Sequence, residues 1–240
     1  MTLLLLAGTR EARDIARALS RDGIAAVGSL AGVTRAPEKL SLPMRVGGFG
    51  GASGFVAYVK SHNISAVLDA THPFAARISE RTARLCAELD IPYCQFLRPP
   101  WPLEPGWISL GREEELAAHV SSGDIVFLAT GRQTLARFSN LVDVQVICRQ
   151  IEPPEEPFPF PNGRFHIARP PFSTDDEQRL FRELGVNWVV AKNAGGETSR
   201  TKLYAASALG LKVALIERPP QPEGAKAASI DACLSWVRAL

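Results

Sequence analysis

The fold class of this chain is decided by the stretch LLLLAGTREAR, residues 3–13. Residues 3–7 form a short apolar run, which predicts a buried strand, and Gly8 permits a tight turn directly after it. Over residues 11–22, apolar side chains recur at helical spacing while charged side chains occupy the other face. A buried strand, a glycine turn and an amphipathic helix are typical of the beginning of a βαβ unit.

The same alternation continues along the chain, which predicts a parallel sheet covered by helices on both faces. The expected strands are residues 3–7, 25–30, 44–46, 66–70, 93–97, 125–129, 144–148, 165–168, 188–191 and 213–216. The expected helices are residues 11–22, 54–62, 75–90, 113–121, 174–184, 199–209 and 230–239. The sequence therefore predicts an α/β protein.

Length and proline placement predict two lobes. At about 150 residues per domain, 240 residues correspond to one large domain or two small ones. Four prolines within residues 98–106 exclude a helix or an inner strand there, so we expect lobes 1–105 and 106–240. Five prolines within residues 153–161 predict an extended loop inside the second lobe.

A weak internal repeat supports two similar lobes. Residues 66–100 and 188–220 share the order strand, loop, helix, strand and Arg-Pro-Pro. Ordinary βαβ geometry explains this likeness equally well, so duplication stays one of two readings.

Composition excludes several classes of protein. Hydrophobic residues make up 46% and charged residues 22% of the chain, as in an ordinary globular protein. A net charge of +2 does not indicate a nucleic-acid surface, although a local anion site stays open. The first apolar run is too short to span a membrane and has the wrong flanks for a signal peptide, so we expect a cytoplasmic protein. The four cysteines and four histidines lack metal-ligand spacing, so we expect buried thiols and no metal site.

Ligands of open parallel sheets bind beyond the carboxyl ends of the strands, where we therefore look for site residues. The turn after the first strand, Gly8, Thr9, Arg10 and Glu11, is a candidate phosphate cradle because helix amides point out of it. The alternative is an ordinary turn in which Thr9 caps the helix.

The end of the second strand discriminates between cofactors. An enzyme that prefers NAD is expected to have Asp or Glu there, but residues 28–35 contain neither. Ser29, Leu30, Thr34 and Arg35 suit a 2′-phosphate instead, because a guanidinium presents several donors to phosphate oxygens. We therefore predict NADPH as cofactor and residues 1–105 as its lobe; the alternative for Arg35 is a solvated surface arginine.

The fourth expected strand is followed by Thr71, His72 and Pro73, which we also assign to the cofactor site. His72 is a weak candidate for a catalytic acid, and a role in holding the loop is favoured over it. No nucleophile motif accompanies this histidine.

In the second lobe, two strand ends combine glycine with a hydroxyl or amide and a fixed cation, which suits carboxylates or phosphates. We assign these residues to the substrate: Thr130, Gly131, Arg132, Lys192, Asn193, Gly195 and Gly196. Arg98, Arg169 and Arg218 each precede two prolines and either ring the mouth of a cleft or pair with neighbouring groups.

Several of these stretches resemble the precorrin-6A reductases of cobalamin (vitamin B12) biosynthesis. They occur in family order and cover nearly the whole chain: residues 8–13, 29–35, 46–51, 69–75, 98–101, 130–132, 192–196 and 216–219. The run Asp-Ala-Thr-His-Pro-Phe-Ala at 69–75 and the Lys-Asn-x-Gly-Gly turn at 192–196 are specific, whereas the first glycine turn is not. Ala7 and Ala194 replace residues that are often Gly and Ser in the family.

The resemblance implies an NADPH-dependent reduction of one carbon–carbon double bond of the macrocycle precorrin-6A, giving precorrin-6B. It further implies two Rossmann-like lobes with the active-site cleft between them, and a tetrapyrrole-derived substrate whose carboxylates explain the cations at the strand ends. The metal-free and cobalt-containing substrates, the proton donor and the oligomeric state are left open. The alternatives are an NADPH-dependent reductase of another acidic small molecule and a non-catalytic NADPH-sensing regulator.

Overall fold

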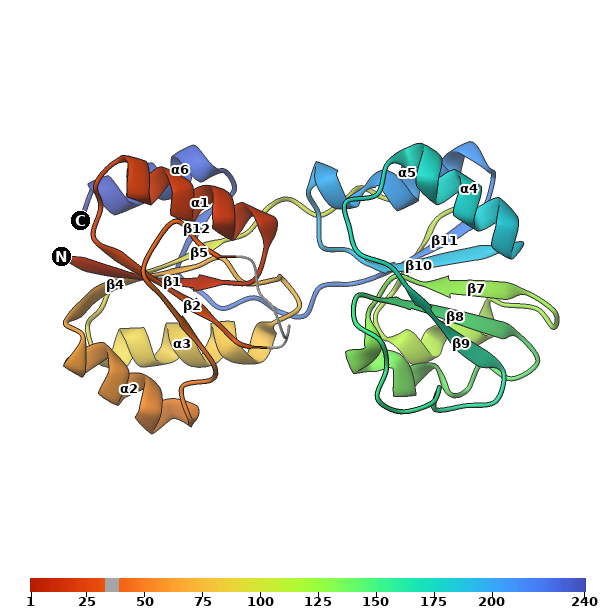
Figure 1. Ribbon diagram of the computed structural model, residues 1–240, viewed down its shortest axis with the longest axis horizontal. Helices are drawn as coiled ribbons and strands as arrows, with labels where there is room; N and C mark the ends of the chain where they lie inside the picture. Colours follow the sequence, from red (N-terminus) through yellow and green to blue (C-terminus); the bar gives the residue numbers. More distant parts are fainter. Residues whose placement is uncertain (33–38) are drawn as a thin grey trace. The chain divides into compact units, whose positions relative to one another are not determined.

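The computed structural model describes residues 1–32 and 39–240, which form two compact units (Figure 1). The first unit contains Met1–Pro99 and Pro219–Leu240, and the second contains Pro100–Arg218. Each unit is built on a parallel six-stranded sheet. The predicted α/β class with two Rossmann-like units is therefore confirmed.

The first unit has the strand order β12-β5-β4-β1-β2-β3. Its strands are β1 (Thr2–Ala7), β2 (Ala26–Leu30), β3 (Met44–Val46), β4 (Ile64–Asp69), β5 (Tyr93–Phe96) and β12 (Ala225–Ala227). Helices α1 (Arg10–Arg21) and α6 (Ile230–Arg238) lie on one face of the sheet, and α2 (Gly51–Ser61) and α3 (Ala76–Glu88) lie on the other (Figure 1).

Burial on both faces explains why β1 is continuously apolar. Leu3 and Leu5 belong to the core shared with α1 and α6, whereas Leu4 and Leu6 belong to the core shared with α2 and α3. Because side chains alternate along a strand, each layer receives every second leucine. This strand has no wet face, as expected for the centre of a parallel sheet.

The second unit has the order β6-β11-β10-β7-β8-β9. Its strands are β6 (Ile108–Leu110), β7 (Ile125–Leu128), β8 (Gln145–Gln150), β9 (Gly163–Ile167), β10 (Trp188–Lys192) and β11 (Lys212–Ile216). One face carries α4 (Thr174–Leu184) and α5 (Thr201–Ala208), which pack on Phe127 and Ile147. The other carries the 3₁₀ segments η1 (Glu113–Ala118) and η2 (Arg132–Phe138), and η3 (Glu197–Ser199) precedes α5.

The two sheets have the same topology. Each of them, however, contains one edge strand that follows a strand of the other sheet along the chain. β6 follows β5 in sequence yet pairs with β11, and β12 follows β11 yet pairs with β5. The predicted lobe 106–240 is therefore wrong for Pro219–Leu240, which belongs to the first unit. The physical reason is the parallel pairing of β12 with β5 and the burial of Cys233 and Leu234 in the core with α1.

Other differences from the expected elements are local. The expected helix 113–121 is the 3₁₀ segment η1, and the three-residue edge strands β6 and β12 were not predicted. Residues 153–161 form neither helix nor strand, as predicted, and the division after Pro99 falls in the predicted proline-rich segment.

All four cysteines are buried and free, which confirms the expected thiols. Burial raises the pKa of Cys86 and of Cys233 to about 12, so these thiols are poor nucleophiles. Within residues 1–32 and 39–240, no helix has the length and apolar character needed to cross a membrane.

Candidate functional site

In the first unit, the strand order reverses between the neighbouring strands β1 and β4. The helices that follow these strands, α1 and α3, lie on opposite faces of the sheet (Figure 1). Such a reversal opens a crevice for ligands at the carboxyl ends of the two strands. The hydroxyl of Thr9 donates to the carbonyl of Ala70 over 3.0 Å, so the structure brings the two predicted turns of the cofactor site together.

The turn after β1 combines structural contacts with open space. Thr9 caps α1 and accepts a hydrogen bond from the Ala12 amide at 3.1 Å, as the alternative reading of this turn predicted. Glu11 pairs with Arg98 at the end of β5 over 2.5 Å, so this predicted cofactor residue is engaged in an ion pair. A Cβ atom at Gly8 would meet nothing within 4 Å, which leaves space for a ligand. Arg10 is exposed beside it.

At the end of β2, Ser29 is almost fully buried and has an arginine partner that the sequence analysis missed. Arg45 on the adjacent strand β3 donates to the Ser29 hydroxyl over 2.8 Å and to the Gly48 carbonyl over 2.9 Å. Its guanidinium lies 4.0 Å from the centre of the Phe49 ring. The missed signal is register, because Arg45 lies directly beside Ser29 in the sheet. Predicted Thr34 and Arg35 lie outside the described residues, and Leu30 is partly buried at the strand end.

The turn after β4 is held by a buried carboxylate. Asp69 accepts hydrogen bonds from the Thr71 amide at 3.0 Å and from the Tyr93 hydroxyl at 2.8 Å. Burial, together with the Asp69 charge, raises the pKa of Tyr93. His72 Nδ1 accepts from the Phe74 amide at 3.2 Å, so this ring holds its own loop. That contact agrees with the favoured positional role of His72.

Two further contacts complete the turn after β4. The Thr71 hydroxyl lies 3.2 Å from the Ser79 hydroxyl on α3. The carbonyl of Pro73 accepts a hydrogen bond from the side-chain amide of Gln221 at 2.9 Å. Of the predicted cofactor residues of this turn, Thr71 is therefore held by α3 and Pro73 by the returning C-terminal segment of the chain.

In the second unit, the order reverses between β7 and β10, and the segments that follow them, η2 and α5, cover opposite faces. Val190 pairs with Leu128, and Leu128 pairs with Cys148. Lys192 and Gln150 stand two residues further along β10 and β8, and Thr130 lies two residues beyond the end of β7, so we expect the three residues to lie side by side at the strand ends. We call these three residues the polar row.

The polar row contains buried groups that lack partners. Thr130 is 6% exposed and Gln150 is 8% exposed. The Thr130 hydroxyl and both amide atoms of Gln150 make no hydrogen bond within the described part of the chain. Leaving such groups unsatisfied costs about 1–3 kcal/mol each, which is expected where a ligand supplies the partner. Gln150 was not among the predicted site residues. The feature that could have indicated it is an amide side chain at the end of an apolar strand.

The charges around the polar row favour an anion. Burial lowers the pKa of Lys192, and the nearby carboxylate of Glu113 opposes that shift. Glu113 itself pairs with Arg137 over 3.1 Å. Gly131 has a φ of 75°, which places Arg132, the exposed first residue of η2, directly after the turn. An ammonium, a hydroxyl and an amide in one row are suited to a carboxylate.

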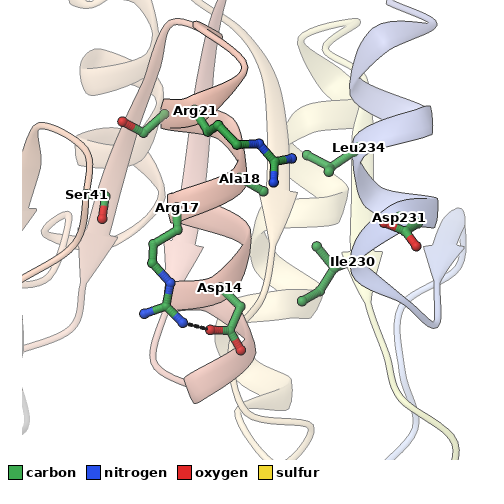
Figure 2. Close-up of a pocket in the computed structure, with 9 residues that line it drawn as sticks. Asp14, Arg17, Ala18, Arg21, Ser41, Ile230, Asp231 and Leu234 are labelled. Carbon is green, nitrogen blue, oxygen red and sulfur yellow. Dashed lines mark hydrogen bonds and ion pairs between the residues drawn. The ribbon is translucent and has the colours of Figure 1, made fainter.

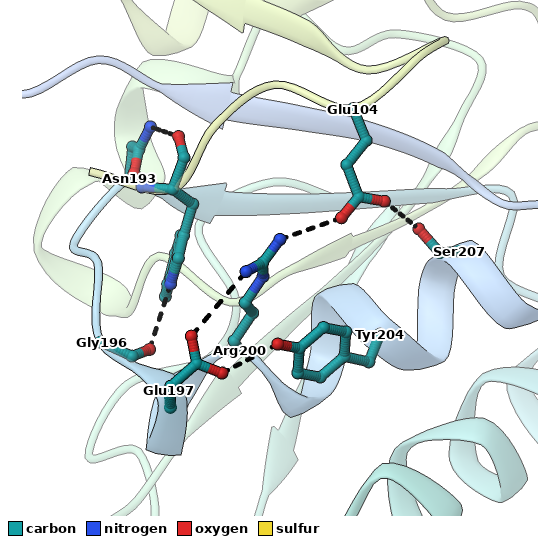
Figure 3. A network of polar contacts seen from close by, with 8 residues as sticks. Glu104, Asn193, Gly196, Glu197, Arg200, Tyr204 and Ser207 are labelled. Carbon is teal, nitrogen blue, oxygen red and sulfur yellow. Dashed lines mark hydrogen bonds and ion pairs between the residues drawn. The ribbon is translucent and has the colours of Figure 1, made fainter. Parts of the chain in front are cut away.

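Trp101 holds the loop after β10 through hydrogen bonds to Asn193 and Gly196. Figure 3 shows the positions of Asn193 and Gly196 in this loop. The Asn193 side chain accepts from the Trp101 amide at 2.8 Å and donates to its carbonyl at 3.0 Å. The indole of Trp101 donates to the Gly196 carbonyl at 3.1 Å. Both polar atoms of the Asn193 side chain are therefore engaged by the Trp101 backbone. These contacts favour a role in holding the loop over the predicted contact with substrate. Gly195, with a φ of 69°, supplies the turn between them.

The three arginines before the proline pairs have partners within their own units. Arg98 pairs with Glu11, and Arg169 pairs with Glu152. Arg218 donates to the Asn193 carbonyl over 2.7 Å. These contacts favour the structural alternative stated for these side chains.

A hollow of about 690 Å³ lies elsewhere, between α1 and α6 (Figure 2). Ala18 and Leu234 form apolar parts of its wall, and Asp14, Arg17 and Arg21 contribute charged side chains. Its lining contains none of the predicted site residues. The strand-end turns, and not this hollow, therefore carry the candidate site.

The fold and the turns define a class of protein, namely two Rossmann-like units, each with a strand reversal whose carboxyl-end turns carry the candidate site residues. The family model of the precorrin-6x reductases CbiJ/CobK matches residues 2–238. The chain therefore belongs to the precorrin-6x reductase family, which confirms the resemblance seen in its motifs, and it is an oxidoreductase.

Individual relatives agree with this assignment. The precorrin-6A reductase of Rhodobacter capsulatus is 42% identical over 98% of this chain and 95% of the relative. The cobalt-precorrin-6A reductase of Synechocystis is 29% identical over 91% of this chain and 88% of the relative. The solved structure of CobK precorrin-6A reductase superposes with a TM-score of 0.94 at 40% identity, covering 100% of this chain and 96% of that one.

Proposed function

We propose that this protein uses NADPH to reduce one carbon–carbon double bond of metal-free precorrin-6A, giving precorrin-6B. The choice of metal-free precorrin-6A rests on a difference in sequence identity between two groups of relatives. The precorrin-6A reductases among the relatives described are 36–42% identical to this chain, whereas the cobalt-precorrin-6A reductases are 26–29% identical.

The residues of the first unit fit NADPH. The open space before Gly8 and the capped start of α1 suit a phosphate, because amides at a helix start favour anions. The end of β2 presents Ser29 and Arg45 and has no carboxylate within residues 28–32, which suits a 2′-phosphate better than a ribose hydroxyl. Bound NADPH supplies the hydride.

The side chains of the protein bind and align the cofactor and the substrate. Thr71 and His72 shape the turn beside the cofactor crevice, and the polar row with Arg132 binds carboxylates at the edge of the substrate. Alignment of this kind lowers the barrier because hydride transfer requires the reacting atoms about 3–3.5 Å apart. Exclusion of water prevents competing reactions.

Cofactor selectivity provides the first test. Arg35→Ala should weaken NADPH binding about 10- to 100-fold and leave NADH binding nearly unchanged, because one charge-assisted contact to the 2′-phosphate is worth about 1.5–3 kcal/mol. Dissociation constants for both cofactors measure the effect, with the exposed Arg84→Ala on α3 as the matched control. Equal losses for the two cofactors would remove Arg35 from the phosphate site.

Substrate choice provides the second test. Under anaerobic conditions with NADPH, kcat/KM should be at least about tenfold higher for precorrin-6A than for cobalt-precorrin-6A. A difference of tenfold corresponds to about 1.4 kcal/mol of transition-state binding. A preference for the cobalt-containing macrocycle would contradict the substrate assignment while leaving the reductase assignment intact.

A further inference from the structure

We propose that Lys202 donates the proton that completes the reduction, an inference that rests on the proposed function. Adding a hydride to one carbon of a double bond leaves an electron pair that must be captured by a proton at the conjugated position. The role needs an acidic group fixed beside the substrate crevice of the second unit. Lys202 is the second residue of α5, the helix that follows β10 at the strand reversal.

The surroundings of Lys202 leave its ammonium without a counter-ion. Lys202 is partly buried and donates to the carbonyl of Ser199. Its Nζ atom lies 5.5 Å from the centre of the Trp101 ring. Within the described residues it forms no ion pair. A cation in such a position is poised to give its proton away rather than to balance a carboxylate.

The charged groups facing Lys202 explain why the nearby carboxylate does not serve as its partner. Glu177 on α4 forms two hydrogen bonds with Arg149 at the end of β8, at 2.7 and 2.8 Å. That pair satisfies the Glu177 carboxylate. The positive charge of Arg149 still acts on the Lys202 ammonium. Burial and the Arg149 guanidinium lower the pKa of Lys202 to about 8, and Glu177 opposes the shift. A donor with this pKa is protonated at neutral pH and releases its proton readily.

A polar network keeps the segment before and around Lys202 in place (Figure 3). Arg200 pairs with Glu104 over 3.0 Å, and Ser207 donates to the same carboxylate over 2.9 Å. Tyr204 donates to Glu197 over 2.8 Å, which ties α5 to η3. These contacts fix the first turn of α5 on one face of the sheet, while Arg132 and η2 lie on the other. The first turn of α5, which carries Lys202, and the start of η2, which carries Arg132, therefore lie on opposite faces of the sheet beside the strand reversal of β7 and β10.

Protonation by Lys202 completes the addition of a hydride and a proton to the double bond. The Nζ–H bond of Lys202 breaks, and the electron pair released at the substrate by hydride addition forms the new C–H bond. The substrate is reduced by the two electrons of the hydride, and Lys202 is left as a neutral amine. Solvent reprotonates the amine before the next turnover.

The test compares Lys202→Met with Lys212→Met, a matched control because Lys212 is exposed in the same unit and lies 5.2 Å from the centre of the Trp188 ring. We measure kcat between about pH 6 and 10, the solvent deuterium isotope effect, and the precorrin-6A dissociation constant from its absorbance. Lys202→Met should lower kcat about 10²- to 10⁴-fold with the dissociation constant nearly unchanged. In the wild type and in Lys212→Met, kcat should fall as pH rises through about 8; Lys202→Met should lack this decline.

Each other outcome is decisive. If Lys202→Met raises the precorrin-6A dissociation constant but keeps kcat, Lys202 only contacts a carboxylate and the proposal is wrong. If kcat and its pH dependence are unchanged, another group gives the proton. A wild-type protein that binds precorrin-6A and NADPH without oxidising the cofactor overturns the proposed function itself, which separates the two failures.

Discussion

Replacing Arg149 with methionine should lower the free energy of unfolding by about 3–5 kcal/mol. The side chains of Arg149 and Glu177 are 11% and 2% exposed, and they form a two-point pair. Arg149→Met keeps apolar volume against the rings of Phe127 and Phe172 but leaves the Glu177 carboxylate buried without its partner. The loss of stability comes from the buried Glu177 carboxylate that has lost Arg149, and not from lost packing.

Urea denaturation of three variants measures this effect. The double variant Arg149→Met/Glu177→Met should recover most of the loss, because replacing a whole buried pair by apolar groups is often neutral. Arg84→Met removes the exposed Arg84–Glu88 pair on α3 and should cost less than about 1 kcal/mol. A loss for Arg149→Met no larger than for Arg84→Met would contradict the assigned burial.

Lys192→Ala should weaken use of precorrin-6A about 10- to 100-fold, because it removes a charge-assisted contact worth about 1.5–3 kcal/mol from the polar row. The loss appears in KM if the contact is equal in ground and transition states, and in kcat if it also aligns the substrate. NADPH binding should be nearly unchanged, because Lys192 ends β10 of the second unit.

Gln150→Leu in the polar row should separate binding from stability. The variant removes two buried amide atoms that make no hydrogen bond within residues 1–32 and 39–240, so it should raise the free energy of unfolding by about 1–3 kcal/mol. It should also weaken precorrin-6A binding, because the amide is expected to meet the ligand. Urea denaturation and substrate titration give the two values.

A Lys192→Ala protein whose NADPH affinity collapses while its precorrin-6A affinity is untouched would overturn the assignment of the polar row.

The central strands could be predicted from sequence because both of their faces are buried. The apolar runs at β1 and β10 therefore mark their strands to within a residue or two. The edge strands β6 and β12 contain no apolar run, because Ser109 interrupts β6 and Ala225 and Lys226 are exposed in β12. Their strand state depends on pairing with β11 and β5, which is a long-range property.

The candidate site was predictable in part for the same reason. Turns at strand ends, such as Gly8–Thr9 and Thr71–His72, follow from the strands themselves. Arg45 beside Ser29 and Gln150 beside Thr130 depend on register between strands, which the residue order does not reveal. The side chain of Asn193 is occupied by Trp101, 92 residues earlier in the chain, and no local pattern indicates that contact.

The central claim is that this chain transfers a hydride from NADPH to precorrin-6A. The most direct measurement is the mass of the macrocycle after anaerobic incubation with NADPH that carries deuterium at the transferring carbon. We expect one deuterium per macrocycle, one NADPH oxidised for each macrocycle reduced, and a matching change in the absorbance of the macrocycle. Oxidation of NADPH without deuterium in the macrocycle, or no oxidation with both ligands bound, would contradict the account.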